Sequence, residues 1–265
     1  MNIGFAGVGN MASAIINGLL QHTIPGVTGL HAYSPSGAKS AFESCLTWHS
    51  SNKELANAVD IIVIGVKPHL VTSVLADIQD TANQPMIVSL AAGVTTSTIE
   101  AHTASKTAVI RTMPNTPSAI NAGMTGLFHN HQVTEQQKQI INALFLSIGE
   151  VLWLNDESKF HVLTAISGSG PAYFFQFTDA LIKAGIDQGL TAEEAAILAV
   201  QTAKGAGLLM SKSGKTPAQL QKEVTSPNGT TAAATNCFQK DGLFQLVDTA
   251  VSCARQRSIE LSEGR

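Results

Sequence analysis

The first 155 residues of the chain alternate between strand-like runs and helical patterns. Strand-like runs occur at residues 3–6, 30–33, 60–66, 86–90 and 107–110. Two shorter runs, at 126–128 and 151–154, flank a helical pattern over residues 134–148. Because apolar strands separated by helices are typical of parallel sheets covered on both faces, the pattern predicts an α/β domain with a mainly parallel sheet.

The pattern changes after Asn155, where strand-like alternation ends. Helical patterns then cover residues 158–166, 171–187, 192–210, 217–224, 230–239 and 243–261. Only six residues between Phe160 and Met210 are charged, too few for helices that all face water in a small monomeric bundle. We therefore expect residues 1–155 to form the α/β domain, and residues 156–265 to form an all-helical domain that associates with a second copy of itself.

The first strand runs directly into a glycine-containing turn and a helix. Residues 7–12 read Gly-Val-Gly-Asn-Met-Ala, a G-x-G-x-x-A sequence typical of dinucleotide-binding Rossmann domains. Gly7 permits the tight turn, Gly9 lets the backbone approach a pyrophosphate, and Ala12 lets helix and strand pack closely. Free N–H groups and the positive end of the helix dipole would hold the pyrophosphate. Residues 1–155 are therefore predicted to be a Rossmann-type nucleotide-binding domain.

The end of the second strand distinguishes between the two nicotinamide dinucleotides. NAD sites usually place Asp or Glu about 20 residues after the glycines, where it binds the ribose 2′-hydroxyl. Here no acidic residue occurs before Glu43, and the strand ends in Ser34-Pro35-Ser36 with Lys39 following. Two hydroxyls and an ammonium group suit a 2′-phosphate, so the segment favours NADPH over NADH. An ordinary Ser-Pro turn with a solvated lysine is the alternative interpretation.

Five other segments are candidates for binding. Residues 66–68, 91–93 and 113–117 leave the carboxyl ends of predicted strands, where open α/β sheets bind ligands. Their small and proline-fixed backbones suit a flat nicotinamide ring and its ribose, although each is also an ordinary strand–helix turn. In the helical region, residues 167–171 (Ser-Gly-Ser-Gly-Pro) and 225–231 (Thr-Ser-Pro-Asn-Gly-Thr-Thr) are tight turns into helices. Bare N–H groups at the first of these turns could bind a carboxylate, whereas both turns are also good helix starts.

Composition limits the classes of function. The chain has 265 residues, 44% hydrophobic and 13% charged, and its net charge of −3 without a basic cluster argues against nucleic-acid partners. The most apolar stretch, residues 61–66, is about a third of a membrane span, so no membrane is expected. Three widely spaced cysteines indicate a reducing cytoplasm. No metal is expected, because His129 and His131 would lie on opposite faces of a strand.

Five motifs occur in one order along the chain: residues 3–12, 66–69 (Val-Lys-Pro-His), 113–117 (Met-Pro-Asn-Thr-Pro), 167–173 and 225–231. Together they closely resemble those of Δ1-pyrroline-5-carboxylate reductases, which catalyse the last step of proline synthesis, over essentially the whole chain. The resemblance implies an NADPH-binding Rossmann domain followed by an all-helical domain that dimerises, sometimes into larger rings. It also implies an active site between the nicotinamide and helical segments, some of them from the partner subunit.

The resemblance also implies the site residues. Cofactor contacts are expected at Gly7, Gly9, Asn10, Met11, Ser34, Asn52, Val66, Lys67, Pro68, Ala92 and Pro114. Their loop neighbours Val8, Ser36, Ala91, Gly93, Met113 and Asn115 complete the predicted cofactor site. The predicted substrate site consists of Ser169, Gly170, Gly229, Thr230 and Thr231. Ser169 and Gly170 would meet the substrate carboxylate, and Thr231, the predicted catalytic residue, would hydrogen-bond the ring nitrogen.

The chain departs from the family pattern at one position of this site. The family's usual Ser-Pro-Gly-Gly reads Ser226-Pro227-Asn228-Gly229 here. Because Asn tolerates a positive φ angle better than most residues do, we expect the turn to be retained.

Two other functions are weighed against this prediction. A β-hydroxyacid dehydrogenase shares the domain order, but such enzymes use a lysine and an asparagine early in the second domain, and residues 172–177 contain neither. A non-catalytic NADP-binding redox sensor would keep the Gly7 turn but would not need two anion-ready helix starts. The sequence offers no obvious general acid. That suits a protonated ring imine, which is already a strong hydride acceptor. The resemblance therefore implies an oxidoreductase that converts Δ1-pyrroline-5-carboxylate to L-proline with NADPH.

Overall fold

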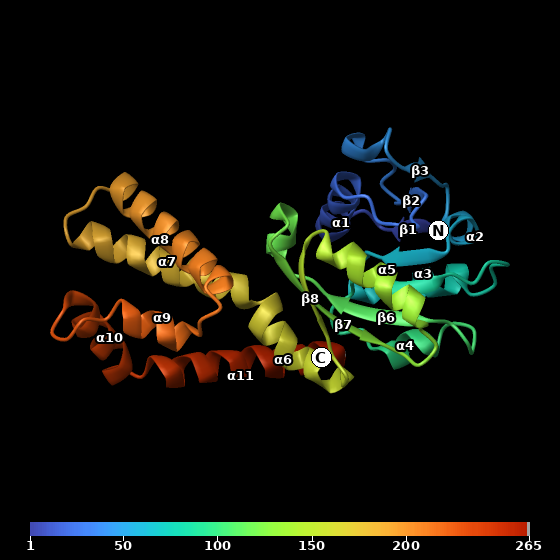
Figure 1. The fold of residues 1–265 in the computed structure, drawn as a ribbon. Coiled ribbons are helices and arrows are strands. Elements are labelled where there is room, and N and C mark those ends of the chain that lie inside the picture. The colour runs from blue at the N-terminus through green and yellow to red at the C-terminus, as the bar shows by residue number, and fades with distance from the viewer. Residues whose placement is uncertain (264–265) are drawn as a thin grey trace. The chain divides into compact units, whose positions relative to one another are not determined.

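A computed structural model describes residues 1–263 and divides into two compact units (Figure 1). Unit 1 contains residues 1–168 together with the described residues from Ala254 onward, and unit 2 is Ser169–Cys253. The sequence predicts a division between residues 155 and 156, where the strand pattern ends. The compact unit instead runs on through residue 168, and the end of the last helix returns to it.

An eight-stranded sheet forms the centre of unit 1 (Figure 1). Its strands are β1 (Asn2–Ala6), β2 (Gly29–Tyr33), β3 (Thr47–Trp48), β4 (Ile61–Ile64), β5 (Met86–Ser89), β6 (Val109–Met113), β7 (Gly123–His129) and β8 (Gly149–Trp153). Their order in the sheet is β3-β2-β1-β4-β5-β6-β7-β8. Only the β6–β7 pair is antiparallel, so the predicted mainly parallel sheet is confirmed.

Helices cover both faces of this sheet. They are α1 (Asn10–Gln21), α2 (Asn52–Ala58), α3 (Val71–Ile78), α4 (Thr96–Glu100), α5 (Glu135–Leu146) and α6 (Phe160–Leu163). One buried cluster joins the sheet to α1 and α5, and a second joins it to α2, α3 and α4. Successive β4 residues alternate between the two clusters, because neighbouring side chains of a strand point to opposite faces. This double burial explains why β4 is apolar throughout.

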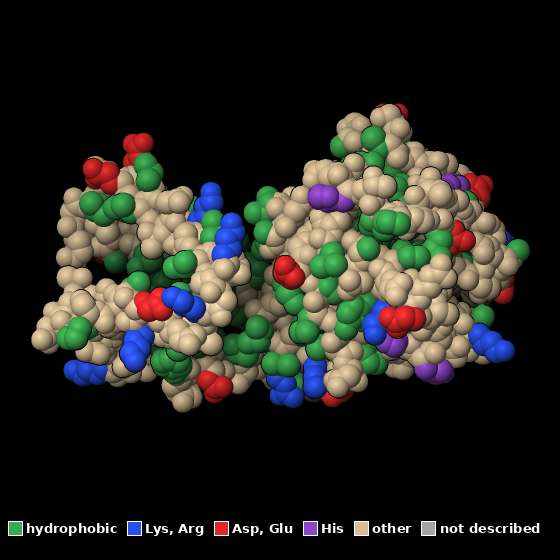
Figure 2. All heavy atoms as spheres, viewed as in Figure 1, with side chains coloured by type: hydrophobic (Ala, Val, Ile, Leu, Met, Phe, Trp, Pro, Cys, Tyr) green, Lys and Arg blue, Asp and Glu red, His purple; other side chains and the backbone are tan. Residues whose placement is uncertain are grey.

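Unit 2 is entirely helical. It contains α7 (Gly170–Asp187), α8 (Ala192–Lys212), α9 (Pro217–Glu223), α10 (Thr230–Lys240) and the first half of α11 (Leu243–Ser262). Within Ser169–Cys253, Ala195 and Ala199 are the buried hydrophobic residues, whereas Phe174 and Phe175 are each 67% exposed. Figure 2 shows hydrophobic side chains open on the surface of these helices. A single copy of unit 2 therefore leaves much of its apolar surface in contact with water.

Three features of the sheet differ from the sequence prediction. The short strand β3 was not predicted, since an exposed Thr47 and a half-buried Trp48 form no hydrophobic run. Strand β6 begins at Val109 rather than Thr107 and continues through Arg111 and Thr112, which are polar but buried. Strand β7 runs antiparallel to β6, and its direction cannot be read from hydrophobicity alone. Within the described residues, no helix is long and apolar enough to cross a membrane.

A pair of histidines joins β2 to the residue that follows β3. The Nδ1 atom of His31 lies 3.0 Å from the Nε2 atom of His49, and the two rings stack with their centroids 5.2 Å apart. Burial lowers the pKa of His31, and the nearby His49 lowers it further. Protonation of His31 therefore opposes folding, since the unfolded chain binds a proton more readily below the ordinary histidine pKa of about 6.5.

We predict that His31→Gln reduces the loss of stability on acidification. In the native protein stability falls as the pH drops below about 6.5, because His31 takes up a proton more readily in the unfolded chain. Melting temperatures at about pH 7.5 and pH 5.5 provide the test, and the difference between them is expected to shrink in the variant. His131→Gln, a change of an exposed histidine, is the control. An unchanged difference in His31→Gln would contradict this assignment.

Candidate cofactor and substrate site

The direction of the sheet reverses between β1 and β4. The chain continues from β1 to β2 on one side, and from β4 to β5 on the other. Such a reversal opens a crevice beyond the carboxyl ends of the two strands, where open α/β sheets bind ligands. The turn that begins at Gly7 leaves β1 at this point, and Gly65 and Val66 leave β4 beside it. The predicted cofactor residues of unit 1 follow the carboxyl ends of β1, β2, β3, β4, β5 and β6.

Two glycines make the backbone of this crevice possible. Gly7 has a φ angle of +89°, and a Cβ atom there would lie 2.8 Å from Cγ1 of Val66. A Cβ atom on Gly65 would lie 2.6 Å from the Gly7 carbonyl oxygen. The turns after β1 and β4 therefore have bare backbone at positions where any other residue would place a side chain. This shape fits a dinucleotide, whose pyrophosphate needs close backbone approach.

Helix α1 begins directly at this turn. Gly9 is its N-cap residue and supplies no side-chain hydrogen bond to the first turn. Gly9 and Asn10 are exposed, Met11 is half-buried, and the Val8 side chain is buried, so Val8 could contact a ligand only through its backbone. The first N–H groups of a twelve-residue helix thus remain open toward an anion.

The predicted 2′-phosphate residues lie after β2. The hydroxyl oxygens of Ser34 and Ser36 are 2.9 Å apart. The Lys39 ammonium group donates to the Ser13 hydroxyl of α1 at 3.2 Å, which directs the lysine toward the start of that helix. Two hydroxyls therefore lie together after β2, and one ammonium group lies at the first turn of α1. These are the kinds of group that a phosphorylated ribose would require.

The predicted cofactor residues after β3 and β4 differ in their solvent exposure and in whether another side chain already binds them. Val66 is half-buried, whereas Lys67 and Pro68 are exposed after β4. Asn52 begins α2 and is buried, and its amide donates to the Asp77 carboxylate of α3 at 2.9 Å. The amide group of Asn52 is thus held by the protein itself, and its contact with a cofactor stays a prediction.

The loops after β5 and β6 carry the predicted nicotinamide-side residues. Ala91 and Pro114 are buried, Ala92 is exposed, and Met113 is half-buried. Gly93 has a φ angle of +80°. The half-buried Asn115 accepts from the Met124 N–H at 2.9 Å and donates to the Ser167 carbonyl oxygen at 3.1 Å. Its side chain therefore fixes the loop, and only its backbone remains available to a ligand.

Sequence reasoning missed a partly buried ion pair next to these loops. Arg111 of β6 is 4% exposed, and its guanidinium donates to the Glu157 carboxylate at 2.9 Å. The guanidinium also lies 4.4 Å from the centre of the Phe160 ring. The one available signal was an arginine directly after the strand-like run that ends at Ile110. A charge that is buried with such a strand needs a partner. Its partner, 46 residues away, had no signal of its own.

The predicted substrate residues begin two helices of unit 2. Ser169 is the N-cap residue of α7 and Gly229 that of α10, and neither side chain caps its helix. Asn228 has a φ angle of +59°, so the expectation that asparagine takes the family's glycine position is confirmed. A Cβ atom on Gly229 would lie 2.4 Å from the Ser226 hydroxyl oxygen and 3.2 Å from its carbonyl oxygen, so a side chain there would require Ser226 to shift.

The two helix starts lie apart within unit 2. In Figure 1 the start of α7 and the start of α10 are at different ends of the unit. Helix α7 has 18 residues, a length of about 27 Å. One chain therefore does not bring Ser169 and Gly170 together with Thr230 and Thr231.

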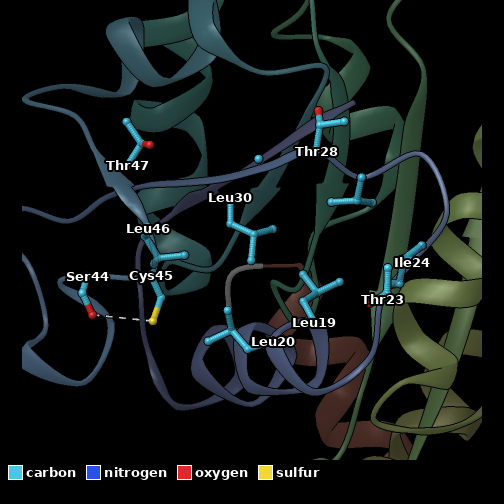
Figure 3. A pocket seen from close by; sticks show the side chains of 12 residues that line it. Leu19, Leu20, Thr23, Ile24, Thr28, Leu30, Ser44, Cys45, Leu46 and Thr47 are labelled. Carbon is cyan, nitrogen blue, oxygen red and sulfur yellow. Dashed lines mark hydrogen bonds between the residues drawn. The ribbon is translucent and has the colours of Figure 1, made fainter.

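A crevice of about 490 Å³ occurs at the opposite edge of the sheet (Figure 3). It lies between the end of α1 and the amino ends of β2 and β3, where Leu19, Leu30 and Leu46 line it. None of the predicted cofactor or substrate residues lines this crevice. It is therefore separate from the candidate site.

Comparisons with known proteins agree with this arrangement. Residues 157–261 match the family model for pyrroline-5-carboxylate reductase dimerisation, and residues 2–93 match that for NADP oxidoreductase, coenzyme F420-dependent. Pyrroline-5-carboxylate reductase of Pseudomonas aeruginosa is 40% identical, over 98% of this chain and 97% of the relative. The chain belongs to the pyrroline-5-carboxylate reductase family.

Solved structures support the same assignment. A pyrroline-5-carboxylate reductase from Coxiella burnetii is 36% identical, with a TM-score of 0.92 over 98% of both chains. Plasmodium falciparum pyrroline carboxylate reductase, solved with NADP bound, is 32% identical, with a TM-score of 0.85 over 99% of this chain and 98% of the other. The family resemblance and the fold class predicted from the sequence are confirmed.

Proposed function

We propose that the protein reduces Δ1-pyrroline-5-carboxylate to L-proline with NADPH, the final step of proline biosynthesis. The observation that carries the proposal is the 40% identity to a pyrroline-5-carboxylate reductase over nearly the whole of both chains. The glycine turns at the end of β1 and β4, and the open start of α1, support a dinucleotide in unit 1. NADPH supplies the hydride in this reaction.

The residues of the chain then have separate roles. Gly7 and Gly9 hold the pyrophosphate through their backbone, and Ser34 and Ser36 bind the 2′-phosphate. The free N–H groups after Ser169 hold the substrate carboxylate. Because a protonated ring imine already accepts hydride, position and orientation are the main requirements, and they can lower the barrier by about 7–11 kcal/mol.

Thr231 is the residue assigned to the ring nitrogen. It is the second residue of α10, and no hydrogen bond of its hydroxyl occurs among those of the described residues. A hydroxyl that is not used as a cap is available to hydrogen-bond a substrate. Since the starts of α7 and α10 lie apart in one chain, we infer that a second copy supplies one of them.

The same second copy would cover the exposed apolar side chains of unit 2. The match of residues 157–261 to a dimerisation model supports a homodimer, and larger rings built from dimers stay a prediction. A cytoplasmic location, expected from the cysteines, also stays a prediction.

An activity assay tests the main proposal. NADPH oxidation is followed with Δ1-pyrroline-5-carboxylate and with a panel of 3-oxo acids, and proline is measured as the product. We expect turnover with the ring imine alone. Turnover with 3-oxo acids would favour a β-hydroxyacid dehydrogenase, and NADPH binding without turnover of any substrate would favour a redox sensor.

We predict that Ser36→Asp shifts preference from NADPH toward NADH, because a carboxylate beside Ser34 would repel the 2′-phosphate. The ratio of kcat/KM values for the two cofactors measures the shift. Ser36→Ala, which removes the hydroxyl without adding charge, is the control and should shift the ratio less. A native protein with a lower KM for NADH than for NADPH would refute the interpretation of this loop.

We predict that Thr231→Ala lowers kcat/KM for the ring imine about 10- to 150-fold, since a hydrogen bond to a charged group contributes about 1.5–3 kcal/mol. Thr231→Ser keeps the hydroxyl and should retain most of the activity. If Thr231 only stabilises the helix start, its loss instead costs about 1 kcal/mol of folding stability. Near-normal turnover in Thr231→Ala, with or without a lower melting temperature, would rule out the catalytic role.

We predict that the protein contains no monomer at micromolar concentration, as measured by light scattering. Ile197 of α8 is 62% exposed in one chain, and Ile197→Asp should dissociate the assembly if it lies in the interface. Leu146→Asp, the same kind of change on α5 of unit 1, should leave the molar mass unchanged. A native protein that is monomeric and active would contradict the shared site.

A further inference from the structure

The Glu157 carboxylate connects three parts of unit 1. One oxygen, Oε1, accepts from the Thr96 backbone N–H at 2.8 Å and from the Arg111 guanidinium at 2.9 Å. The other oxygen, Oε2, accepts from the Thr96 hydroxyl at 2.6 Å. Thr96 is the first residue of α4, Arg111 lies in β6, and Glu157 begins the segment that leads to α6. One carboxylate therefore fixes a helix, a strand and a connecting segment together.

Both partners of Glu157 adjoin predicted nicotinamide-side loops. The loop from Leu90 to Thr95 joins β5 to α4 and contains Ala91, Ala92 and Gly93. At its start, the Leu90 N–H donates to the Ile64 carbonyl oxygen at 3.1 Å. At its end, Thr96 is held by Glu157. Both ends of the loop are therefore fixed, and between them Gly93 also lies close to the backbone of Leu261 and Ser262 in α11.

The same carboxylate acts on the neighbouring loop through Arg111. This residue lies in β6, two residues before Met113, and the Thr112 hydroxyl between them donates to the Ser89 carbonyl oxygen at 3.0 Å. The ends of β5 and β6 are thus linked to each other and to Glu157. Because taking charges out of water carries a desolvation cost, such an ion pair contributes little net stability. Its directed contacts nevertheless hold Thr96 and Arg111 on one carboxylate.

We propose that Glu157, acting through Thr96, is a positioning residue that holds the Ala91–Gly93 loop where it meets the nicotinamide half of the cofactor. The proposal rests on the proposed function only in that unit 1 binds NADPH. It concerns a residue outside the predicted cofactor and substrate sets.

Thr96→Val is the sharpest test, because it removes the hydroxyl but keeps the side-chain shape, the backbone hydrogen bond and the Arg111–Glu157 ion pair. The dissociation constant of NADPH, measured without substrate, is expected to rise about fivefold or more. The dissociation constant of 2′,5′-ADP, which lacks the nicotinamide half, is expected to change less than twofold. Thr96→Ser keeps the hydroxyl and should restore NADPH binding.

A matched control separates positioning from general loss of stability. Thr107 is also buried, and its hydroxyl donates to the Ala104 carbonyl oxygen at 2.9 Å, before the start of β6. Thr107→Val should lower the melting temperature and leave both dissociation constants unchanged. If Thr96→Val fails to fold, Glu157→Gln is measured in the same way, since it retains the size of the side chain.

The outcomes distinguish the proposals. Equal weakening of NADPH and 2′,5′-ADP, or no weakening of either, would overturn the positioning role. A native protein that binds NADPH but does not reduce the ring imine would refute the proposed function and leave the binding test of Glu157 intact. A native protein that does not bind NADPH would overturn both.

Discussion

The carboxyl ends of β1 and β4 run so close together that neither turn has room for a side chain at its closest point. A Cβ atom on Gly65 would clash with the Gly7 carbonyl oxygen, and a Cβ atom on Gly7 would clash with the Val66 side chain. This contact lies where the sheet changes direction, so it sets the backbone shape of the crevice. The open start of α1 and the hydroxyls after β2 are then placed around that backbone by the order of the strands.

Hydrogen bonds and an ion pair hold the loops after β5 and β6 in position. The loops after β5 and β6 have few large side chains that could pack, since residues 91–93 are Ala-Ala-Gly and residues 114–117 are Pro-Asn-Thr-Pro. Their positions come from a few directed contacts, those of Glu157 with Thr96 and Arg111 and those of Asn115 with Met124 and Ser167. Such contacts specify one arrangement more sharply than apolar packing does, and a cofactor ring needs a fixed surface.

Much of unit 1 could be predicted because its central strands β4 and β5 are buried on both faces. The apolar runs that became β4 and β5 are readable without a structure, as is the Gly7 turn, whose constraint is local. The positive φ angle of Asn228 could also be predicted, because it depends only on the local turn that contains this residue. Hydrophobic runs and turn residues were therefore sufficient to predict these strands and turns.

Contacts between distant segments could not be predicted in this way. Arg111 and Glu157 are 46 residues apart, and only the folded chain shows that one neutralises the other. Asn115 was expected beside a cofactor, but that its side-chain amide holds Ser167 is visible only in the folded chain. The reversed direction of β7 likewise follows from how the chain returns to β6, which no hydrophobic pattern records.

A single copy of unit 2 leaves its apolar side chains exposed and its two open helix starts apart, and association with a second copy would address both. Its helices bury little besides two alanines, although aromatic residues such as Phe174 and Phe244 stand 67% and 77% exposed. Its two open helix starts, at Ser169 and at Gly229, lie at different ends of the unit. Burial of apolar surface is the dominant force in association, whereas a carboxylate site by itself contributes little to it. The hydrophobic faces would therefore determine how two copies join, and the substrate site would follow from that geometry.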